Sequence, residues 1–134
     1  MRETLLIGNE IRFDSEEQAS SRSLLRYPGG KTRAIDFISQ FFPSKLEYLL
    51  SPFLGGGSIE LNFAAHGTTV YGYDIFSPLV EFWQCLISQP NELANKVAEY
   101  YPLPKSRFYE LQEEQTKAKR KLERAAIYYV LNRS

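Results

Sequence analysis

A glycine-rich loop between a predicted strand and a predicted helix constrains the fold more than any other feature of the sequence. Residues 46–50 are apolar enough for a buried strand, residues 51–57 contain three consecutive glycines, and residues 58–65 predict a short helix that ends before Gly67. Residues 68–73, rich in β-branched and aromatic side chains, predict the next strand. A helix between two strands implies parallel pairing, so the pattern predicts an α/β fold with a Rossmann-like beginning.

Further helices are predicted on both sides of this unit. Thr32 is expected to cap a helix, because apolar residues recur at helical spacing over residues 35–42 and Pro43 follows. Ser77 followed by Pro78 marks another helix start. Additional helices are predicted over residues 91–100 and 106–134. With two predicted sheet strands the sequence resembles half of a domain, since a parallel sheet needs several strands and helices on both faces.

The N-terminal residues are predicted to lie outside this unit. Residues 5–13 contain the turn signal Gly8-Asn9 between two apolar runs, which allows a short hairpin. Residues 14–23 are rich in Ser and Glu and lack periodicity, as is typical of a linker. We therefore divide the chain into an N-terminal extension, residues 1–23, and a partial domain, residues 24–134.

Composition narrows the class of protein only slightly. The 134 residues suffice for one domain, and Lys plus Arg equal Asp plus Glu at 16 each, so net charge gives no argument about a nucleic-acid partner. Cys85 is the single cysteine, which excludes an internal disulfide and predicts a small buried side chain. No apolar run reaches the roughly 18 residues of a membrane span. No secretion signal and no zinc-ligand spacing are recognisable, so we expect a cytoplasmic protein without a metal.

The glycine-rich loop itself suggests a ligand site. Gly55, Gly56 and Gly57 can adopt positive φ and let a ligand approach the backbone, while the following helix offers unpaired N–H groups at its start. The alternative is a plain tight connection between strand and helix. The loop is not the dinucleotide fingerprint G-x-G-x-x-G, because Glu60 occupies the position of the third glycine.

Asp74 follows the second predicted strand, 19 residues after Gly55. An acidic residue at about this offset, at the carboxyl end of the strand, can accept hydrogen bonds from both ribose hydroxyls. The alternative is that Asp74 caps the next helix, for which Ser77 competes better because Pro78 follows it. Together with the glycine loop, Asp74 predicts a pocket for an adenosine-type cofactor.

A second glycine-containing loop covers residues 26–32, with the sequence Arg-Tyr-Pro-Gly-Gly-Lys-Thr. Its end imitates a P-loop, but Leu25 stands where that motif requires its first glycine, and the preceding residues do not predict a strand. A triphosphate site is therefore excluded. Lys31 at this turn can instead reach a carboxylate of a cofactor, with Tyr27 packed on its apolar parts.

Together these segments resemble the N-terminal part of the Dam-type, or D12-class, DNA adenine-N6 methyltransferases. Members of that family share four elements in a fixed order. In this chain Tyr27 to Lys31 match the first element, aromatic-x-Gly-Gly-Lys, and Pro52 to Ser58 match the second, Pro-Phe-x-Gly-x-Gly-Ser. The third element is an Asp at the strand end, here Asp74, and the fourth is Leu-Asn-Arg, here residues 131–133. The resemblance spans Leu25 to Ser134, and Ser51 stands where many relatives have Glu.

The resemblance implies a partial Rossmann-like fold of the S-adenosylmethionine-dependent methyltransferases, followed by a helical C-terminal segment. It also implies a set of residues that contact S-adenosylmethionine: Tyr27, Lys31, Phe53, Gly55, Gly56, Gly57, Asp74 and Ile75. In this arrangement Lys31 pairs with the methionine carboxylate, and Phe53 and Ile75 flank the apolar surface of the cofactor. Arg26 matches a position that is basic in some relatives and contacts DNA.

The catalytic motif of the same family, Asp-Pro-Pro-Tyr, does not occur in this sequence. In relatives it follows the Leu-Asn-Arg element and a DNA-recognition insert, and it holds the flipped adenine by its amino group and by stacking. We therefore predict no catalytic residue here, and interpret the chain as the cofactor-binding part of a site-specific DNA adenine-N6 methyltransferase that acts on double-stranded DNA. Alone it is expected to bind S-adenosylmethionine weakly or not at all and to transfer no methyl group.

Two other interpretations remain open. The chain can be one subunit of a split methyltransferase, completed by a second polypeptide, or a non-catalytic interaction protein that keeps the fold. A half-built sheet leaves a strand edge for pairing, so we expect oligomers of the chain itself. Residues 117–124 are basic but are interpreted as a solvated helix face, because acidic residues surround them, and His66 is interpreted as a helix-end residue.

Overall fold

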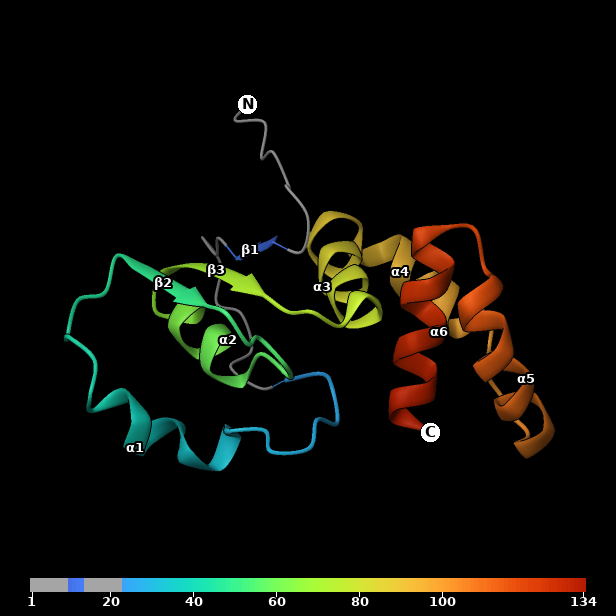
Figure 1. The fold of residues 1–134 in the computed structure, drawn as a ribbon, viewed down its shortest axis with the longest axis horizontal. Coiled ribbons are helices and arrows are strands. Elements are labelled where there is room, and N and C mark those ends of the chain that lie inside the picture. The colour runs from blue at the N-terminus through green and yellow to red at the C-terminus, as the bar shows by residue number, and fades with distance from the viewer. Residues whose placement is uncertain (1–9, 14–22) are drawn as a thin grey trace. The chain divides into compact units, whose positions relative to one another are not determined.

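The structure, a computed structural model, describes residues 10–13 and 23–134 (Figure 1). The first half of the candidate hairpin, its Gly8-Asn9 turn and residues 14–22 of the linker lie outside the described residues. The chain divides into two compact units with a boundary between Ile75 and Phe76. The first is called the sheet unit below, and the second the helical unit.

A sheet organises the first unit. Its described strands are β1 (Glu10–Phe13), β2 (Tyr48–Ser51) and β3 (Thr69–Tyr73). β3 lies in the middle, with β2 parallel to it on one side and β1 antiparallel on the other (Figure 1). Ser51 at the end of β2 is registered with Gly72 near the end of β3. The predicted parallel pairing is confirmed, and it brings the carboxyl ends of β2 and β3 side by side.

β2 is shorter and more exposed than predicted. The sequence predicted a buried strand over residues 46–50, whereas β2 begins at Tyr48 and runs to Ser51. Tyr48 and Leu50 are 59% and 66% exposed. The prediction of a buried strand was wrong because successive side chains point to opposite faces of a sheet, and only those of Leu49 and Ser51 are partly covered.

α2 (Ser58–Ala65) has the bounds that the sequence predicted. It contacts all three described strands and buries Phe63 and Ala64. Gly57 precedes it with a φ of 70°, and Gly67 follows it with a φ of 89°. These positive angles, which favour glycine, explain where α2 starts and stops.

The helix predicted before Pro43 is short, and its cap was predicted wrongly. A 3-10 turn, η1 (Thr32–Ala34), leads into α1 (Ile35–Ser39), so the apolar pattern over residues 35–42 continues beyond the helix end. Thr32 is the first residue of the turn rather than its cap, and its hydroxyl oxygen lies 2.8 Å from that of Ser58. The hydroxyl of Thr32 therefore has a long-range partner at the start of α2, which a local pattern does not reveal.

The helical unit contains four helices, all within its described residues: α3 (Ser77–Ser88), α4 (Pro90–Ala98), α5 (Lys105–Lys117) and α6 (Lys121–Arg133). α6 contacts each of the other three. The buried core draws on all four helices and includes Leu79, Phe82, Trp83, Leu93, Leu111, Ile127 and Val130. Cys85 is buried, as predicted.

Two predictions for this unit were wrong. The helix expected over residues 106–134 is divided, because Ala118 and Arg120 have extended backbone angles. Ser77 was expected to cap α3 but is its first helical residue, and it makes no side-chain cap hydrogen bond. Pro78 nevertheless lies in the first turn, where a missing N–H has no cost.

An ion pair fastens α6 to α3. Arg124 donates hydrogen bonds from Nε to Glu81 Oε2 at 2.9 Å and from Nη2 to Glu81 Oε1 at 2.6 Å. Its Nη1 donates to the main-chain carbonyls of Ala118 and Lys119 at 2.9 and 2.8 Å. The same guanidinium group therefore joins two helices and holds the break between α5 and α6.

We expect Arg124→Gln to lower the free energy of unfolding of the helical unit by about 1–3 kcal/mol, because the bidentate ion pair with Glu81 and two hydrogen bonds to main-chain carbonyls are lost. Arg107→Gln is the matched control, since Arg107 pairs with Glu110 and Glu114 on α5 itself and should change the unfolding midpoint little. Urea unfolding followed by the fluorescence of Trp83, the one tryptophan of the chain, measures both effects. Equal losses in the two variants would contradict the role given to Arg124.

Candidate cofactor pocket

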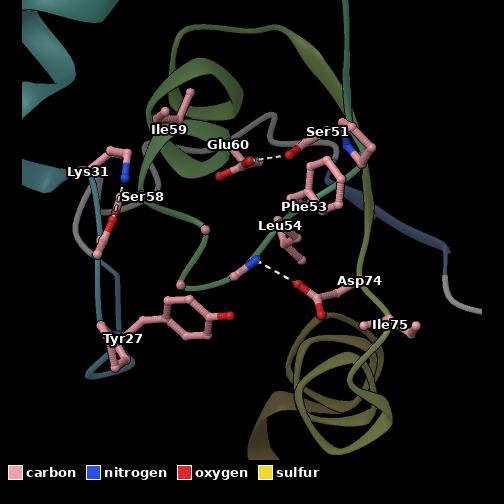
Figure 2. A pocket seen from close by; sticks show the side chains of 17 residues that line it. Tyr27, Lys31, Ser51, Phe53, Leu54, Ser58, Ile59, Glu60, Asp74 and Ile75 are labelled. Atoms are coloured by element: carbon pink, nitrogen blue, oxygen red, sulfur yellow. Dashed lines mark hydrogen bonds between the residues drawn. The ribbon is translucent and has the colours of Figure 1, made fainter.

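A cavity of about 630 Å³ lies in the sheet unit. Three chain segments line it: residues 27–31, residues 51–60, and Asp74 with Ile75 (Figure 2). The second and third segments follow directly from β2 and β3, so the parallel register of these strands creates the site. The volume falls in the range of pockets that hold small molecules and cofactors.

The residues that the resemblance implied as cofactor contacts all line this one cavity, although they come from three separate segments. They are Tyr27, Lys31, Phe53, Gly55, Gly56, Gly57, Asp74 and Ile75. Arg26 is not among the lining residues. The structure thus brings the predicted set together, and the role of each residue stays a prediction.

The glycine loop is shaped by its fit to Tyr27. Gly55 and Gly57 have φ angles of 54° and 70°, which confirms the expected positive φ at these two positions, whereas Gly56 does not have a positive φ. A Cβ atom built on Gly55 would lie 3.0 Å from Tyr27 Cε1, and one on Gly56 would lie 2.9 Å from Tyr27 Cβ. The sequence pattern predicted close approach of a ligand to these glycines, whereas in the structure the close neighbour is a side chain of the protein.

Asp74 is tied to the glycine loop by a hydrogen bond. The main-chain N–H of Gly55 donates to Asp74 Oδ2 at 3.0 Å, and the N–H of Leu54 donates to the carbonyl of Tyr73 at 2.8 Å. Figure 2 shows the Asp74 carboxylate between the loop and Ile75, on the wall of the cavity. A carboxylate offers about four acceptor positions, so the bond to Gly55 is compatible with acceptance from ligand hydroxyls.

Two exposed apolar side chains flank this carboxylate. Phe53 is 88% exposed and Ile75 is 94% exposed, and both line the cavity. Large apolar side chains left open to solvent beside a polar anchor indicate a ligand surface. Phe53 and Ile75 suit contact with a flat apolar ring system of a ligand. The Asp74 carboxylate would fix the orientation of that ligand through hydrogen bonds to its polar groups.

Lys31 contributes the cation of the cavity lining. It stands at the end of the first lining segment, and its Nζ donates to the carbonyl of Gly29 at 2.7 Å. This contact folds the ammonium group back over its own loop, whose turn is closed by a 3.0 Å bond from the Gly30 N–H to the Tyr27 carbonyl. The loop therefore carries both an aromatic ring and a positive charge to one wall.

Glu60 is a lining residue that the sequence analysis missed. Its side chain is only 6% exposed, and the hydroxyl of Ser51 donates to its Oε1. Burial raises the pKa of the Glu60 carboxyl, while the Ser51 hydroxyl and nearby main-chain N–H groups partly oppose this. The helical spacing of Glu60 with Phe63 and Ala64, all buried on α2, is the signal that could have revealed a carboxylate facing inward.

Residues 27–134 match the family described as D12 class N6 adenine-specific DNA methyltransferase, so the chain belongs to this family. Its curated relatives include the DNA adenine methylases of Escherichia coli K12, Salmonella typhi and Salmonella typhimurium LT2. Each is 30% identical to the chain over 120 residues, which cover 84% of the chain and 41% of the relative. The chain thus spans about two fifths of the length of these relatives.

The described residues offer neither a cluster of metal ligands nor a helix able to cross a membrane. Over residues 10–13 and 23–134, no group of three His, Cys, Asp or Glu side chains could hold a metal ion. Within the same ranges, none of the helices is long and apolar enough to cross a membrane.

We expect Gly55→Ala to destabilise the sheet unit by about 1–2 kcal/mol, because alanine is strained at positive φ and its Cβ would press on the Tyr27 ring. In a Tyr27→Ala background only the backbone strain should remain, so the two substitutions should show a coupling energy of about 0.5 kcal/mol or more. Urea unfolding of the four proteins by circular dichroism measures this coupling. Strictly additive losses would show that Tyr27 does not explain the glycine at position 55.

Proposed function

We propose that the chain is the S-adenosylmethionine-binding part of a site-specific DNA adenine-N6 methyltransferase. The observation that carries this proposal is the convergence of the eight implied contact residues on one cavity at the ends of β2 and β3. They come from segments that lie up to 48 positions apart, between Tyr27 and Ile75, in a chain of the D12 family. A cofactor pocket requires such convergence. Glycines that serve only the fold would not require it.

The proposed pose follows from the chemistry of the cavity walls. Asp74 accepts hydrogen bonds from the two ribose hydroxyls, as acidic residues at the end of the second strand do in related nucleotide sites. Phe53 and Ile75, both exposed beside Asp74, flank the adenine ring. Lys31 pairs with the methionine carboxylate, and the Tyr27 ring covers the apolar part between these polar anchors.

The reaction proposed for the whole enzyme is a methyl transfer that needs no metal. When bound, S-adenosylmethionine would supply a methyl group activated by its sulfonium, which would pass to N6 of adenine and leave a neutral thioether, with one proton released to solvent. The contribution of this chain is to bind and orient the donor. The tetrapeptide Asp-Pro-Pro-Tyr does not occur in the 134 residues, so we propose that the chain alone binds the donor weakly and does not methylate DNA.

We expect Asp74→Ala to weaken binding of S-adenosylmethionine at least about tenfold, because two charge-assisted hydrogen bonds to the ribose are lost. Asp74→Asn keeps an acceptor oxygen for the Gly55 N–H and should lose less. Asp36→Ala removes an exposed carboxylate of α1 outside the cavity and should bind like the wild type. Ligand titration followed by nuclear magnetic resonance suits such weak affinities.

Two results would contradict this account. If Asp74→Ala bound S-adenosylmethionine with unchanged affinity, Asp74 would not be the residue that binds the ribose. Absence of any shift in the wild type at ligand concentrations of about 10 mM, where even a weak complex with Kd near 1 mM is mostly formed, would show that the chain does not bind the cofactor by itself.

A further inference from the structure

A second carboxylate lies in the cavity, and neither the family motif nor the proposed pose uses it. Among residues 23–134, Glu60 is the one acidic side chain that is buried, and it lines the cavity from the first turn of α2. An ionised carboxylate is expensive to bury unless it is paired or hydrogen-bonded. A position that packs beside Phe63 and Ala64 would ordinarily be apolar.

Ser51 holds this carboxylate in place. The hydroxyl of Ser51, at the end of β2, donates to Glu60 Oε1 across the glycine loop (Figure 2). A glutamate at position 51 would bring a second carboxylate against Glu60, and the two would repel each other. Because position 51 is a serine, Glu60 is the one carboxylate at this contact.

The charges of the cavity wall complement the proposed ligand. The ionisable side chains that line it are Lys31, Asp74, Glu60 and the phenol of Tyr27, so the wall carries one basic side chain and two carboxyl side chains. S-adenosylmethionine carries one carboxylate and two cations, the ammonium and the sulfonium, together with a ribose diol. With Asp74 on the diol and Lys31 on the ligand carboxylate, Glu60 remains to meet a cation.

We propose that Glu60, positioned by Ser51, binds the ammonium group of the amino-acid moiety of S-adenosylmethionine. This inference rests on the proposed function, because it assigns a further contact within the same pocket. Figure 2 shows Glu60 and Lys31 on the side of the cavity nearest to α2, and Asp74 with Ile75 on the side of β3. The amino-acid end of the ligand therefore lies toward α2, with its two charges divided between Lys31 and Glu60.

The competing explanation is structural, and it predicts the opposite effect on stability. An acidic residue in the first turn of a helix ordinarily stabilises that helix, so its loss should destabilise the protein. Burial of Glu60, however, raises its pKa and favours the protonated form in the free protein. The protonated carboxyl, which does not destabilise the fold, is present at low pH. As pH rises through the raised pKa this form is lost and stability falls, so Glu60→Gln should stabilise the free protein at neutral pH.

The test compares two ligands that differ only at the amino-acid end. S-adenosylhomocysteine carries the ammonium and carboxylate groups, and 5′-methylthioadenosine lacks both. In Glu60→Gln we expect affinity for S-adenosylhomocysteine to fall about tenfold, as for loss of a charge-paired hydrogen bond, with affinity for 5′-methylthioadenosine unchanged. Glu47→Gln, at an exposed glutamate outside the cavity, is the matched control and should change neither.

A pH series adds a readout that a structural role would not move. Affinity of the wild type for S-adenosylhomocysteine should fall as pH decreases and Glu60 takes up a proton, and Glu60→Gln should lose this part of the pH dependence. Lys31, Asp74 and Tyr27, the other ionisable groups of the cavity lining, are present in both proteins. The difference between the two profiles therefore reports on Glu60.

The outcomes separate this inference from the proposed function. Equal weakening of both ligands in Glu60→Gln, or no weakening of either, would overturn the role of Glu60 while leaving Asp74 in place. Absence of binding of either ligand to the wild type would overturn the proposed function and this inference with it.

Discussion

The parallel pairing of β2 with β3 is the constraint on which the pocket depends. It places the glycine loop beside the end of β3, where two successive main-chain N–H groups bond to that end. Leu54 donates to the Tyr73 carbonyl at 2.8 Å, and Gly55 donates to Asp74 Oδ2 at 3.0 Å. The position of the Asp74 carboxylate is therefore set by the main chain of the glycine loop and by the end of β3, and not by the freedom of one side chain.

Glycines allow this arrangement by making room for side chains of the protein. A Cβ atom on Gly72 would lie 3.0 Å from Leu54 Cδ1, and Leu54 is a buried residue of the loop itself. A Cβ atom on Gly55 would meet the Tyr27 ring in the same way. The glycines thus shape the pocket indirectly, because they let Leu54 and Tyr27 pack where the ligand surface is built. The buried Glu60 adds a group whose burial is unfavourable for folding, as is common where a site is built for a ligand.

The sequence predicted the local features well, since they depend on near neighbours. The bounds of α2 followed from the glycines on either side of it, and the parallel pair followed from the strand–helix–strand order. The candidate site could be predicted because its residues belong to short motifs, two of which follow the ends of β2 and β3. What was missed depends on distant partners: the partial exposure of β2, the contact of Thr32 with Ser58, and the inward position of Glu60 opposite Ser51.

The claim that Asp74 meets a ribose diol is tested most directly by comparing adenosine with 2′,3′-dideoxyadenosine, which lacks both hydroxyls. The wild type should bind adenosine at least about tenfold more tightly, and the amide resonance of Gly55, the bond partner of Asp74, should shift with adenosine. In Asp74→Ala the preference should vanish. Equal binding of the two nucleosides by the wild type would contradict the account.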